Sequence, residues 1–432
     1  MTDRPFIRVA HPLRIQGGII EAYLPDVHIG EICKIERSLT NKDVLGEAQV
    51  IGFSGQNTQL SLLTENHGLS RNVLIVPTGH PFKISVNDDI VGAIIDSHGD
   101  ICGRLSNHSH KEKTQNAKKI AINSLPRDFS QRCPVTDVFK TGVRAIDTLL
   151  TCGKGQRIGI FAAAGCGKTS LMRMLIEYAE ADVIVIGVVG ERSREVTELV
   201  VDLKKSNCCH KIILVYTTSD RSCIERYNAA QIATTIAEYF SDKGNDVLLF
   251  MDSITRYARA LRDIALSLGE LPARKGYPAS VFEDLPKLLE RPGHFQYGSI
   301  TAFYTVLIEN EDESDVIGDE VRSVLDGHIY LSQKLAFRGY YPAIDILKSI
   351  SRVFYNVTTE RHQVAASKFR EILTRQADMQ MAIELGEYRR GENAENDMAY
   401  DKKKIMENFL KQAMNDNTEM SKSLNSLYEI IE

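Results

Sequence analysis

The sequence contains no apolar run that approaches the roughly 18 residues of a membrane-spanning helix. Its opening segment, MTDRPFIRVAHPLRI, also lacks the apolar centre of a secretory signal peptide. These two absences argue against a membrane-embedded or exported protein. We therefore expect the chain to remain in the cytoplasm.

Long basic stretches are missing as well. Lys and Arg number 52 against 57 Asp and Glu, so the net charge is -5. Tight nucleic-acid binding draws on a basic surface that releases counterions, and we therefore expect no nucleic-acid partner. The polar, basic segment from Ser106 to Lys119 lacks the interleaved aromatics that stack on bases, and it is predicted to be a solvated loop.

The cysteines lack the paired CxxC spacing of a zinc site. There are eight of them, but Cys208 and Cys209 are adjacent, and Cys166 lies inside a glycine-rich segment. Such a distribution does not suggest a disulfide framework. We expect free thiols.

Three kinds of sequence pattern follow one another along the 432 residues. The first 80 residues carry short apolar runs separated by Gly, Asp and Asn, which are typical of a small antiparallel sheet or barrel. From about Arg157, buried-strand runs alternate with stretches of helical length; the runs are RIGIFA, DVIVIGVV, KIILVYTT and DVLLFMD. This alternation indicates a mostly parallel sheet with both faces covered.

Strand runs are absent after Phe354. Apolar residues recur there at helical spacing, as at Phe369, Ile372 and Phe409. The patterns together predict an α/β protein in three parts. These are an N-terminal barrel over residues 1–80, an α/β core over residues 81–354 and a C-terminal helical domain over residues 355–432.

A glycine-rich segment follows the first of these core strands. The residues AAAGCGKTS lie between the strand run RIGIFA and the helical run LMRMLIEYA, which is the context of a phosphate-binding loop. Gly165 and Gly167 allow the backbone to aim its N–H groups at phosphates, beside the positive end of the next helix. Lys168 is expected to reach the β and γ phosphates of ATP, and the Thr169 hydroxyl to ligate Mg²⁺. The predicted nucleotide-binding residues of this segment are Ala164, Gly165, Cys166, Gly167, Lys168, Thr169 and Ser170.

The segment departs at one position from the pattern GxxxxGK[ST], which has a glycine where this chain has Ala162. Taken alone, it also fits an ordinary glycine-rich turn between a strand and a helix. Two acidic residues later in the chain favour the phosphate loop.

Asp252 is the first of these acidic residues. It ends the apolar run VLLFMD, at the carboxyl edge where open α/β sheets bind ligands. It is predicted to hold Mg²⁺ near Lys168. The alternative is a residue that helps to cap the next helix through Ser253 or Thr255.

Glu191 is the second acidic residue that favours the phosphate loop. It lies in GERSRE, directly after the strand run DVIVIGVV. Hydrolysis needs a base that polarises a water in line with the γ phosphate, and a carboxylate at this edge of the sheet meets that need. The alternative is an exposed first helical turn, where acidic residues complement the helix dipole.

Several segments carry a family resemblance. GERSRE, DSITRYARALRD, GYPASVF and PAIDILKSISR resemble the catalytic subunits of rotary ATP synthases and their secretion relatives. The last segment fits the signature P-[SAP]-[LIV]-[DNH]-xxx-S-x-S from Pro342 to Ser351. TCGKGQRIGIFA, YARALRD, PARKGYPASVF and LLERPG are more similar to the virulence-type ATPases of type III secretion systems than to flagellar export ATPases. Secretion ATPases often lack the first glycine of the loop, which accounts for Ala162.

The resemblance implies a RecA-like P-loop core, a barrel that forms the ring, and a helical domain that meets chaperone-effector complexes. The implied activity is that of a protein-secreting ATPase, a translocase that uses ATP and Mg²⁺ to power chaperone release, unfolding and export of effector proteins. The implied assembly is a homohexamer with a coiled-coil central stalk protein and a stator or regulator protein of the sorting platform. It would lie peripherally at the cytoplasmic face of the bacterial inner membrane.

The resemblance also assigns roles to matching residues. Lys168 and Thr169 would serve phosphate and Mg²⁺, Glu191 the attacking water, and Asp252 the metal. The loop from Pro272 to Pro278 would line the central pore and contact the stalk.

Three further residues take roles from the resemblance. Arg192, next to Glu191, would support the phosphate end of the site. Tyr341 would stack on adenine, although a Tyr in this position alone suggests a packing residue. Arg352 would be an arginine finger for the neighbouring subunit, although a lone Arg is more often a surface or salt-bridge residue.

Two other functions fit parts of the sequence. In a non-catalytic nucleotide-binding ring subunit, the catalytic acid that corresponds to Glu191 would be replaced by another residue. This chain has both Glu191 and Arg352, as a self-sufficient homo-oligomer requires. An RNA motor related to transcription terminators would need a basic, aromatic RNA surface, which the acidic net charge does not favour.

Overall fold

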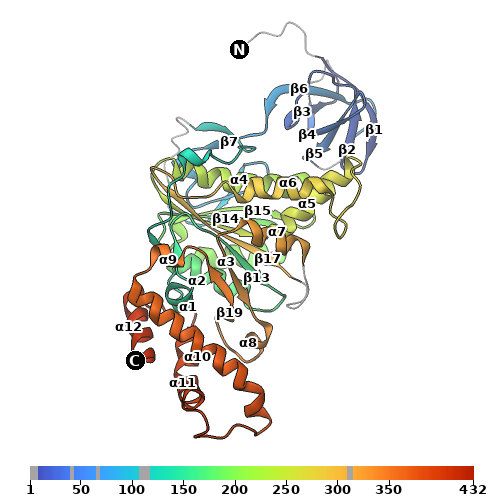
Figure 1. Cartoon of the computed structure of the whole chain (residues 1–432). Helices are drawn as coiled ribbons and strands as arrows, with labels where there is room; N and C mark the ends of the chain where they lie inside the picture. The colour runs from blue at the N-terminus through green and yellow to red at the C-terminus, as the bar shows by residue number, and fades with distance from the viewer. Residues whose placement is uncertain (1–7, 39–42, 65–68, 107–116, 309–314) are drawn as a thin grey trace.

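The computed structural model describes residues 8–38, 43–64, 69–106, 117–308 and 315–432. Its first part is a curved sheet of six antiparallel strands at one end of the molecule (Figure 1), in the order β1-β2-β5-β4-β3-β6. Ala10, just before β1, exchanges two backbone hydrogen bonds with Ile75 in β6, so the two edges of the sheet meet and form a barrel. The strands are β1 (Pro12–Gln16), β2 (Ile19–Ala22), β3 (Glu31–Glu36), β4 (Val44–Ser54), β5 (Asn57–Leu62) and β6 (Leu74–Pro81).

A nine-stranded sheet forms the core of the second part, in the order β19-β18-β13-β17-β16-β14-β15-β8-β9. All neighbouring pairs from β18 to β8 are parallel, and only the edge strands β19 and β9 run antiparallel to their neighbours. Every residue of β14 is buried, as expected for a central strand with both faces covered. The strands are β8 (Ala93–Ile95), β9 (Ile101–Arg104), β13 (Arg157–Ala162), β14 (Val183–Glu191), β15 (Ile212–Thr218), β16 (Asp246–Asp252), β17 (Ser299–Leu307), β18 (Gly327–Leu331) and β19 (Ile344–Ser351).

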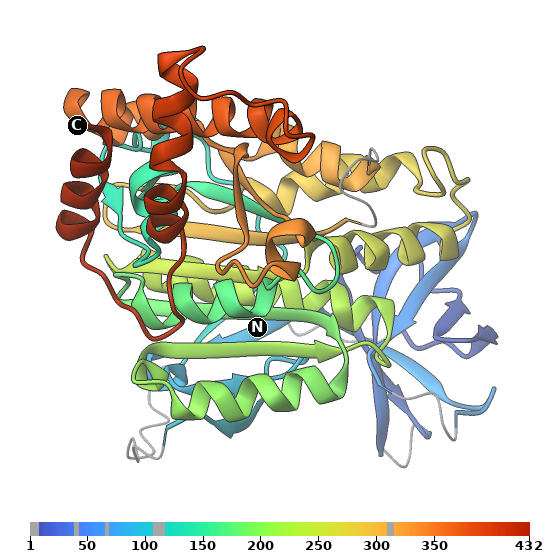
Figure 2. The ribbon, with the colours of Figure 1, turned by 90° about the horizontal axis from the view of Figure 1, so that it is seen from below.

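Helices cover both faces of this sheet (Figures 1 and 2). Helices α4 (Cys223–Ser241), α5 (Ile254–Ser267) and α6 (Ala279–Leu289) lie on the barrel side, and α1 (Arg144–Leu149), α2 (Lys168–Tyr178) and α3 (Ser193–Lys205) lie on the side of the C-terminal helices. The order of the strands explains this division. The chain moves one way along the sheet from β13 to β15 and then back to β17, and right-handed crossovers therefore place α2 and α3 on one face and α4 to α6 on the other.

Shorter elements complete the core. Helices α7 (Val316–Val324), α8 (Gln333–Phe337) and α9 (Phe354–Val357) flank β18 and β19 in the sequence. Two small antiparallel pairs join β7 (Lys83–Val86) to β10 (Lys118–Ala121) and β11 (Val138–Phe139) to β12 (Cys152–Gly153). Three single turns of 3-10 helix lie at η1 (Asp88–Ile90), η2 (Phe129–Gln131) and η3 (Cys209–Lys211).

The last part of the chain consists of three helices, α10 (Glu360–Glu384), α11 (Ala394–Leu410) and α12 (Met420–Ile431). Phe369 of α10 and Phe409 of α11 meet with their ring centroids 5.5 Å apart. Both rings are buried, so the helical periodicity noted in the sequence corresponds to the faces that pack together.

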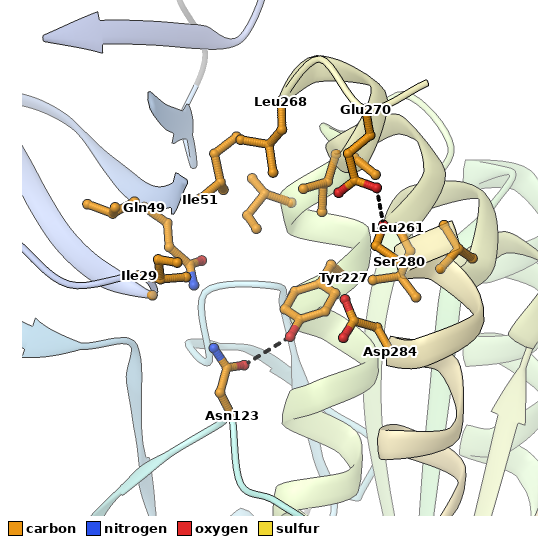
Figure 3. A pocket seen from close by; sticks show the side chains of 16 residues that line it. Ile29, Gln49, Ile51, Asn123, Tyr227, Leu261, Leu268, Glu270, Ser280 and Asp284 are labelled. Atoms are coloured by element: carbon orange, nitrogen blue, oxygen red, sulfur yellow. Dashed lines mark hydrogen bonds between the residues drawn. The ribbon is translucent and has the colours of Figure 1, made fainter. Parts of the chain in front are cut away.

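The barrel packs on the core through the end of α5. A Cβ atom at Gly52 in β4 would lie 2.7 Å from a methyl carbon of Leu268, so glycine allows this close approach. Nearby, the buried amide of Asn228 in α4 donates to Gln49 Oε1 at 3.2 Å. A cavity of about 180 Å³ lies beside this contact, between β4 and helices α4 to α6 (Figure 3), and Tyr227 and Asn123 face each other at its floor.

Most sequence-based expectations for the fold are confirmed. The α/β core, the N-terminal barrel and the C-terminal helices are present, and the eight cysteines, all of which are among the described residues, form no disulfide. Among the described residues, no helix has the length and apolar character needed to cross a membrane.

The prediction of a loop from Ser106 to Lys119 is wrong at the C-terminal end of that segment. Residues 107–116 lie outside the described residues, but Lys118 and Lys119 begin β10. Ile120 of β10 pairs with Ile84 of β7, which is more than 30 residues away in the chain. The pairing partner of this short segment was therefore not visible in its local sequence.

Candidate nucleotide site

The glycine-rich segment forms a loop between β13 and α2. Gly165 and Gly167 have φ angles of 81° and 84°, in the left-handed region that favours glycine. Gly167 is the N-cap of α2 and provides no side-chain hydrogen bond, so the first N–H groups of the helix are available to an anion. Ala162, where the usual pattern has glycine, is the last residue of β13 and pairs with strands on both sides. Its ordinary strand conformation does not require a glycine.

Lys168 and Asp252 meet at the carboxyl edge of the sheet. The Lys168 Nζ atom lies 2.7 Å from Asp252 Oδ1, and the same carboxylate oxygen accepts a hydrogen bond from the Thr305 hydroxyl at 2.7 Å. The N-cap of α5 is Ser253, whose hydroxyl oxygen accepts from the Arg256 N–H. Asp252 is therefore not needed to cap α5, and its carboxylate faces the phosphate loop.

Glu191 lies on the same edge, at the end of β14. Its side chain is buried, and its Oε1 atom is 4.0 Å from Lys168 Nζ. Burial and the neighbouring Asp252 carboxylate raise the pKa of Glu191, whereas the cations of Lys168 and Arg256 oppose this rise. The exposed first-turn position, considered as an alternative for Glu191, is wrong.

Arg256 is a functional candidate that the sequence reasoning missed. Its guanidinium donates two hydrogen bonds to the Glu191 carboxylate, at 2.9 and 2.8 Å. The signal was present in the segment DSITR, because Arg256 lies in the first turn of the helix that follows Asp252 and therefore near the same edge of the sheet. Only the order of the strands shows that β14 and β16 are neighbours.

Arg192 does not join this cluster. It is the N-cap of α3, its side chain is 78% exposed, and its nearest ionic partner is Glu195 at 3.8 Å. The strand ends at Glu191, so adjacent residues there point to different sides. Within one chain, Arg256 and not Arg192 contacts Glu191, and the role of Arg192 at the phosphate end of the site stays a prediction.

Tyr341 lies against the phosphate loop. A Cβ atom built on Gly167 would be 2.9 Å from its ring, so any side chain there would displace the tyrosine. Tyr341 remains 39% exposed, which leaves an aromatic surface beside the loop. Thr169, in the first turn of α2, is also exposed.

Arg352 lies at the opposite end of β13 from the loop. Its N–H donates to the Asp326 carbonyl, and the Asp326 N–H donates to the carbonyl of Arg157, the first residue of β13. Five residue steps along that strand correspond to about 16 Å. The Arg352 side chain is exposed and contacts the Arg322 carbonyl oxygen at 3.3 Å.

The interdomain cavity in Figure 3 is separate from this cluster. Its lining comes from the barrel, from Asn123 just after β10, and from α4, α5 and α6. Neither Lys168, Asp252 nor Glu191 contributes to it. The chemistry-bearing residues are therefore at the sheet edge and not in the cavity.

Two family models match the chain. Residues 142–351 match the nucleotide-binding domain of the ATP synthase alpha/beta family. Residues 358–429 match the C-terminal domain of the type III secretion system ATPase EscN. The first match spans the phosphate loop, Glu191 and Asp252, and the second covers α10, α11 and most of α12.

Individual relatives agree with these matches. The chain is 54% identical to the SPI-1 type 3 secretion system ATPase of Salmonella typhi, over 92% of this chain and 91% of that protein. It is 41% identical to the flagellum-specific ATP synthase of Bacillus subtilis, over 99% and 96% of the two chains. The assembled ATPase EscN of enteropathogenic E. coli superposes with a TM-score of 0.88 at 41% identity, covering 98% of this chain and 100% of EscN. EscN has also been solved in complex with its central stalk EscO, and that structure superposes with a TM-score of 0.86.

Proposed function

We propose, from the premise that the chain belongs to the family of type III secretion system ATPases, that Lys168, Asp252 and Glu191 form the site at which it hydrolyses ATP. The chain is a nucleotide-binding ATPase that powers protein export. The observation that carries the assignment of the site is the convergence of one lysine and two carboxylates beside an uncapped, glycine-rich helix start. We further propose that ATP hydrolysis drives the release of chaperones and the unfolding of effector proteins.

The phosphates would bind at the start of α2. Its free N–H groups and the Lys168 ammonium supply positive charge where the β and γ phosphates carry negative charge. Asp252 and the Thr169 hydroxyl offer the oxygen ligands that Mg²⁺ prefers, and the bound ion would neutralise charge on the phosphate oxygens. Among the described residues, no group of three or more His, Cys, Asp or Glu side chains is arranged to hold an ion by itself, so the ion would be shared with the nucleotide.

Glu191 would polarise the attacking water. A base must be ionised to accept a proton, and burial works against that ionisation. Lys168 and the two hydrogen bonds from Arg256 favour the carboxylate. The same contacts fix the direction of the carboxylate toward the loop.

A second subunit would complete the site. Arg352 lies at the end of β13 opposite to the phosphate loop of its own chain, and that strand is about 16 Å long, so Arg352 is better placed to serve a neighbouring ring member. We propose a homohexamer in which Arg352 acts across the interface, and Arg192, exposed beside the site, faces the same interface. EscN has been solved as an assembled ATPase and in complex with its central stalk EscO, which supports such a ring with a stalk partner.

Other partners remain proposals from the family. The loop Pro272–Pro278 follows α5 and forms an exposed turn, in which Arg274 and Tyr277 pair through their backbones. We place the stalk contact there. The helical domain would receive chaperone-effector complexes, and a regulator of the sorting platform would hold the ring beneath the inner membrane.

The substitution Glu191→Gln tests the site. The amide keeps the shape of the side chain but cannot act as a base, so phosphate release should fall roughly 10²- to 10⁴-fold while ATP binding persists. The matched control is Glu198→Gln, an exposed residue of α3 that pairs with Arg194, which should retain normal turnover. Near-normal turnover in Glu191→Gln would move the base elsewhere. Absence of turnover in the unmodified ring, with stalk protein added, would favour the non-catalytic ring subunit.

A further inference from the structure

Two adjacent tyrosines connect the helical domain with the phosphate loop. Tyr340 is 8% exposed, and its hydroxyl donates to the Glu407 carbonyl oxygen in α11 at 3.1 Å. The Lys411 ammonium lies 4.7 Å from the centre of the same ring. Tyr341 lies against Gly167 instead. One short backbone segment therefore carries an anchor in the helical domain and an aromatic surface at the nucleotide site.

Gln412, two residues after the end of α11, holds this segment from a second side. Its N–H donates to the Tyr341 carbonyl oxygen at 2.9 Å. Its buried side-chain oxygen accepts from the Arg144 N–H at 2.7 Å, and its side-chain nitrogen donates to the Gly142 and Asp416 carbonyl oxygens at 2.8 and 2.7 Å. Gln412 thus joins three segments: the loop before α1, the segment of Tyr341, and the link between α11 and α12.

The Arg144 side chain also contacts α11 and the link between α11 and α12. Its guanidinium donates to the Phe409 carbonyl oxygen at 3.0 Å and to the Asp416 carboxylate at 3.0 Å, and it lies 5.7 Å from the centre of the Phe409 ring. Buried polar networks whose members are all hydrogen-bonded resist the displacement of any single member. A shift of the link between α11 and α12 is therefore expected to move the Tyr341 segment with it.

We propose that Gln412 is a positioning residue that sets where Tyr341 presents its ring to the nucleotide base, and that it thereby couples the helical domain to base binding. The inference rests on the proposed stacking role of Tyr341. The phosphate end is held independently, since Lys168 is fixed by Asp252 at the end of β16. Coupling of this kind is reciprocal: a partner that displaces the helical link changes base affinity, and bound nucleotide changes partner affinity by the same factor.

The test separates base binding from phosphate binding. The full chain is loaded with a fluorescent ATP analogue, which is then displaced by ATP or by inorganic tripolyphosphate. In Gln412→Ala, ATP affinity should fall about three- to tenfold, the range expected for the loss of side-chain hydrogen bonds. Tripolyphosphate affinity should stay within about twofold, because that ligand has no base to position. Gln412→Asn, which retains an amide on a shorter side chain, should shift the same ratio in the same direction and serves if the alanine variant does not fold.

Two controls make the result decisive. Gln376→Ala removes another nearly buried glutamine of the helical domain, which donates to the Ala399 carbonyl at 2.8 Å, and it should lower stability without changing the ratio of the two affinities. Tyr341→Ala should change the ratio at least as much as Gln412→Ala. An equal loss of ATP and tripolyphosphate affinity in Gln412→Ala, or no loss, overturns the positioning role while Tyr341 keeps its role. An unchanged ratio in Tyr341→Ala overturns the stacking role itself, and the positioning role with it.

Discussion

Arg256 and Glu191 form a bidentate ion pair that joins the first turn of α5 to the end of β14. The two hydrogen bonds measure 2.9 and 2.8 Å, and the Glu191 side chain is almost completely buried while Arg256 keeps some exposure. The carboxylate lies where burial and Asp252 both favour its protonated form. The guanidinium therefore helps to set the pH range in which Glu191 can act as a base.

This pair predicts a pH-dependent phenotype for Arg256→Gln. Loss of the cation destabilises the charged form of Glu191 and raises its pKa further. Because hydrolysis needs the deprotonated form, the acid limb of the pH profile for kcat should move to higher pH, and the loss of activity should be greater at low pH than at high pH. Steady-state phosphate release between about pH 5 and pH 9 measures this shift.

Arg262→Gln is the matched control for that experiment. Arg262 is also in α5, but its guanidinium pairs with Asp263 instead of Glu191. The acid limb of the kcat profile of Arg262→Gln should coincide with that of the unmodified protein. If Arg256→Gln lowers kcat by the same factor at every pH, the arginine does not act through the ionisation of Glu191.

Arg352 is predicted to act in the neighbouring subunit. A guanidinium at the transition state is worth roughly 10³-fold or more in rate, so Arg352→Ala should stop turnover while nucleotide binding is nearly unchanged. Lys168→Ala should stop turnover through loss of the loop cation. If the two inactive proteins are mixed and rings re-form, about a quarter of the interfaces pair an intact loop with an intact finger, and activity should return.

The mixing experiment needs one further measurement. Small shares of either variant are titrated into unmodified rings, with mixed rings verified by mass spectrometry. A steep loss of activity indicates that the sites of a ring depend on each other, which would explain a mixture without recovery. A loss proportional to the added share, combined with no recovery in the mixture, would rule out action in trans.

The turn after α5 is predicted to transmit the effect of the stalk. Reversing the charges of Arg274 and Lys275 to Glu should weaken stimulation of ATPase activity by a stalk protein and leave basal hydrolysis intact, because the turn is exposed and separate from the phosphate loop. Rates with and without stalk protein measure the effect. Equal loss of basal and stimulated rates would place the contact elsewhere.

Gly155 is predicted to be essential for stability. Its φ is +84°, and a Cβ atom there would lie 2.3 Å from the His294 backbone nitrogen and 2.7 Å from the Gly293 carbonyl carbon. Backbone atoms cannot rotate away as a side chain can, so Gly155→Ala should cost roughly 3 kcal/mol or more. Gly269→Ala has the same backbone strain at φ +88° with nothing within 4 Å, and it should cost only about 1 kcal/mol. Urea unfolding compares the two, and equal costs would show that the contact with His294 is relaxed by a shift of the backbone.

Residues whose roles depend on local context were predictable from the sequence. The phosphate loop needs only a strand, two glycines and a helix in succession, and these are adjacent along the chain. Asp252 could be placed because it ends an apolar strand, and parallel strands end at one edge of a sheet. The alternation of strands and helices indicated the covered sheet, and helical spacing indicated the C-terminal domain.

The tertiary structure decided which of these residues meet. The contact of Arg256 with Glu191 depends on β14 and β16 being neighbours in the sheet, although β15 lies between them in the sequence. Arg192 and Glu191 are adjacent in the sequence, yet one side chain is exposed and the other buried, because the strand ends between them. Gln412 contacts Arg144 across 268 positions. Local patterns determine how each segment folds, but the order of strands and the direction of each side chain depend on packing between distant segments, and these set the geometry of the site.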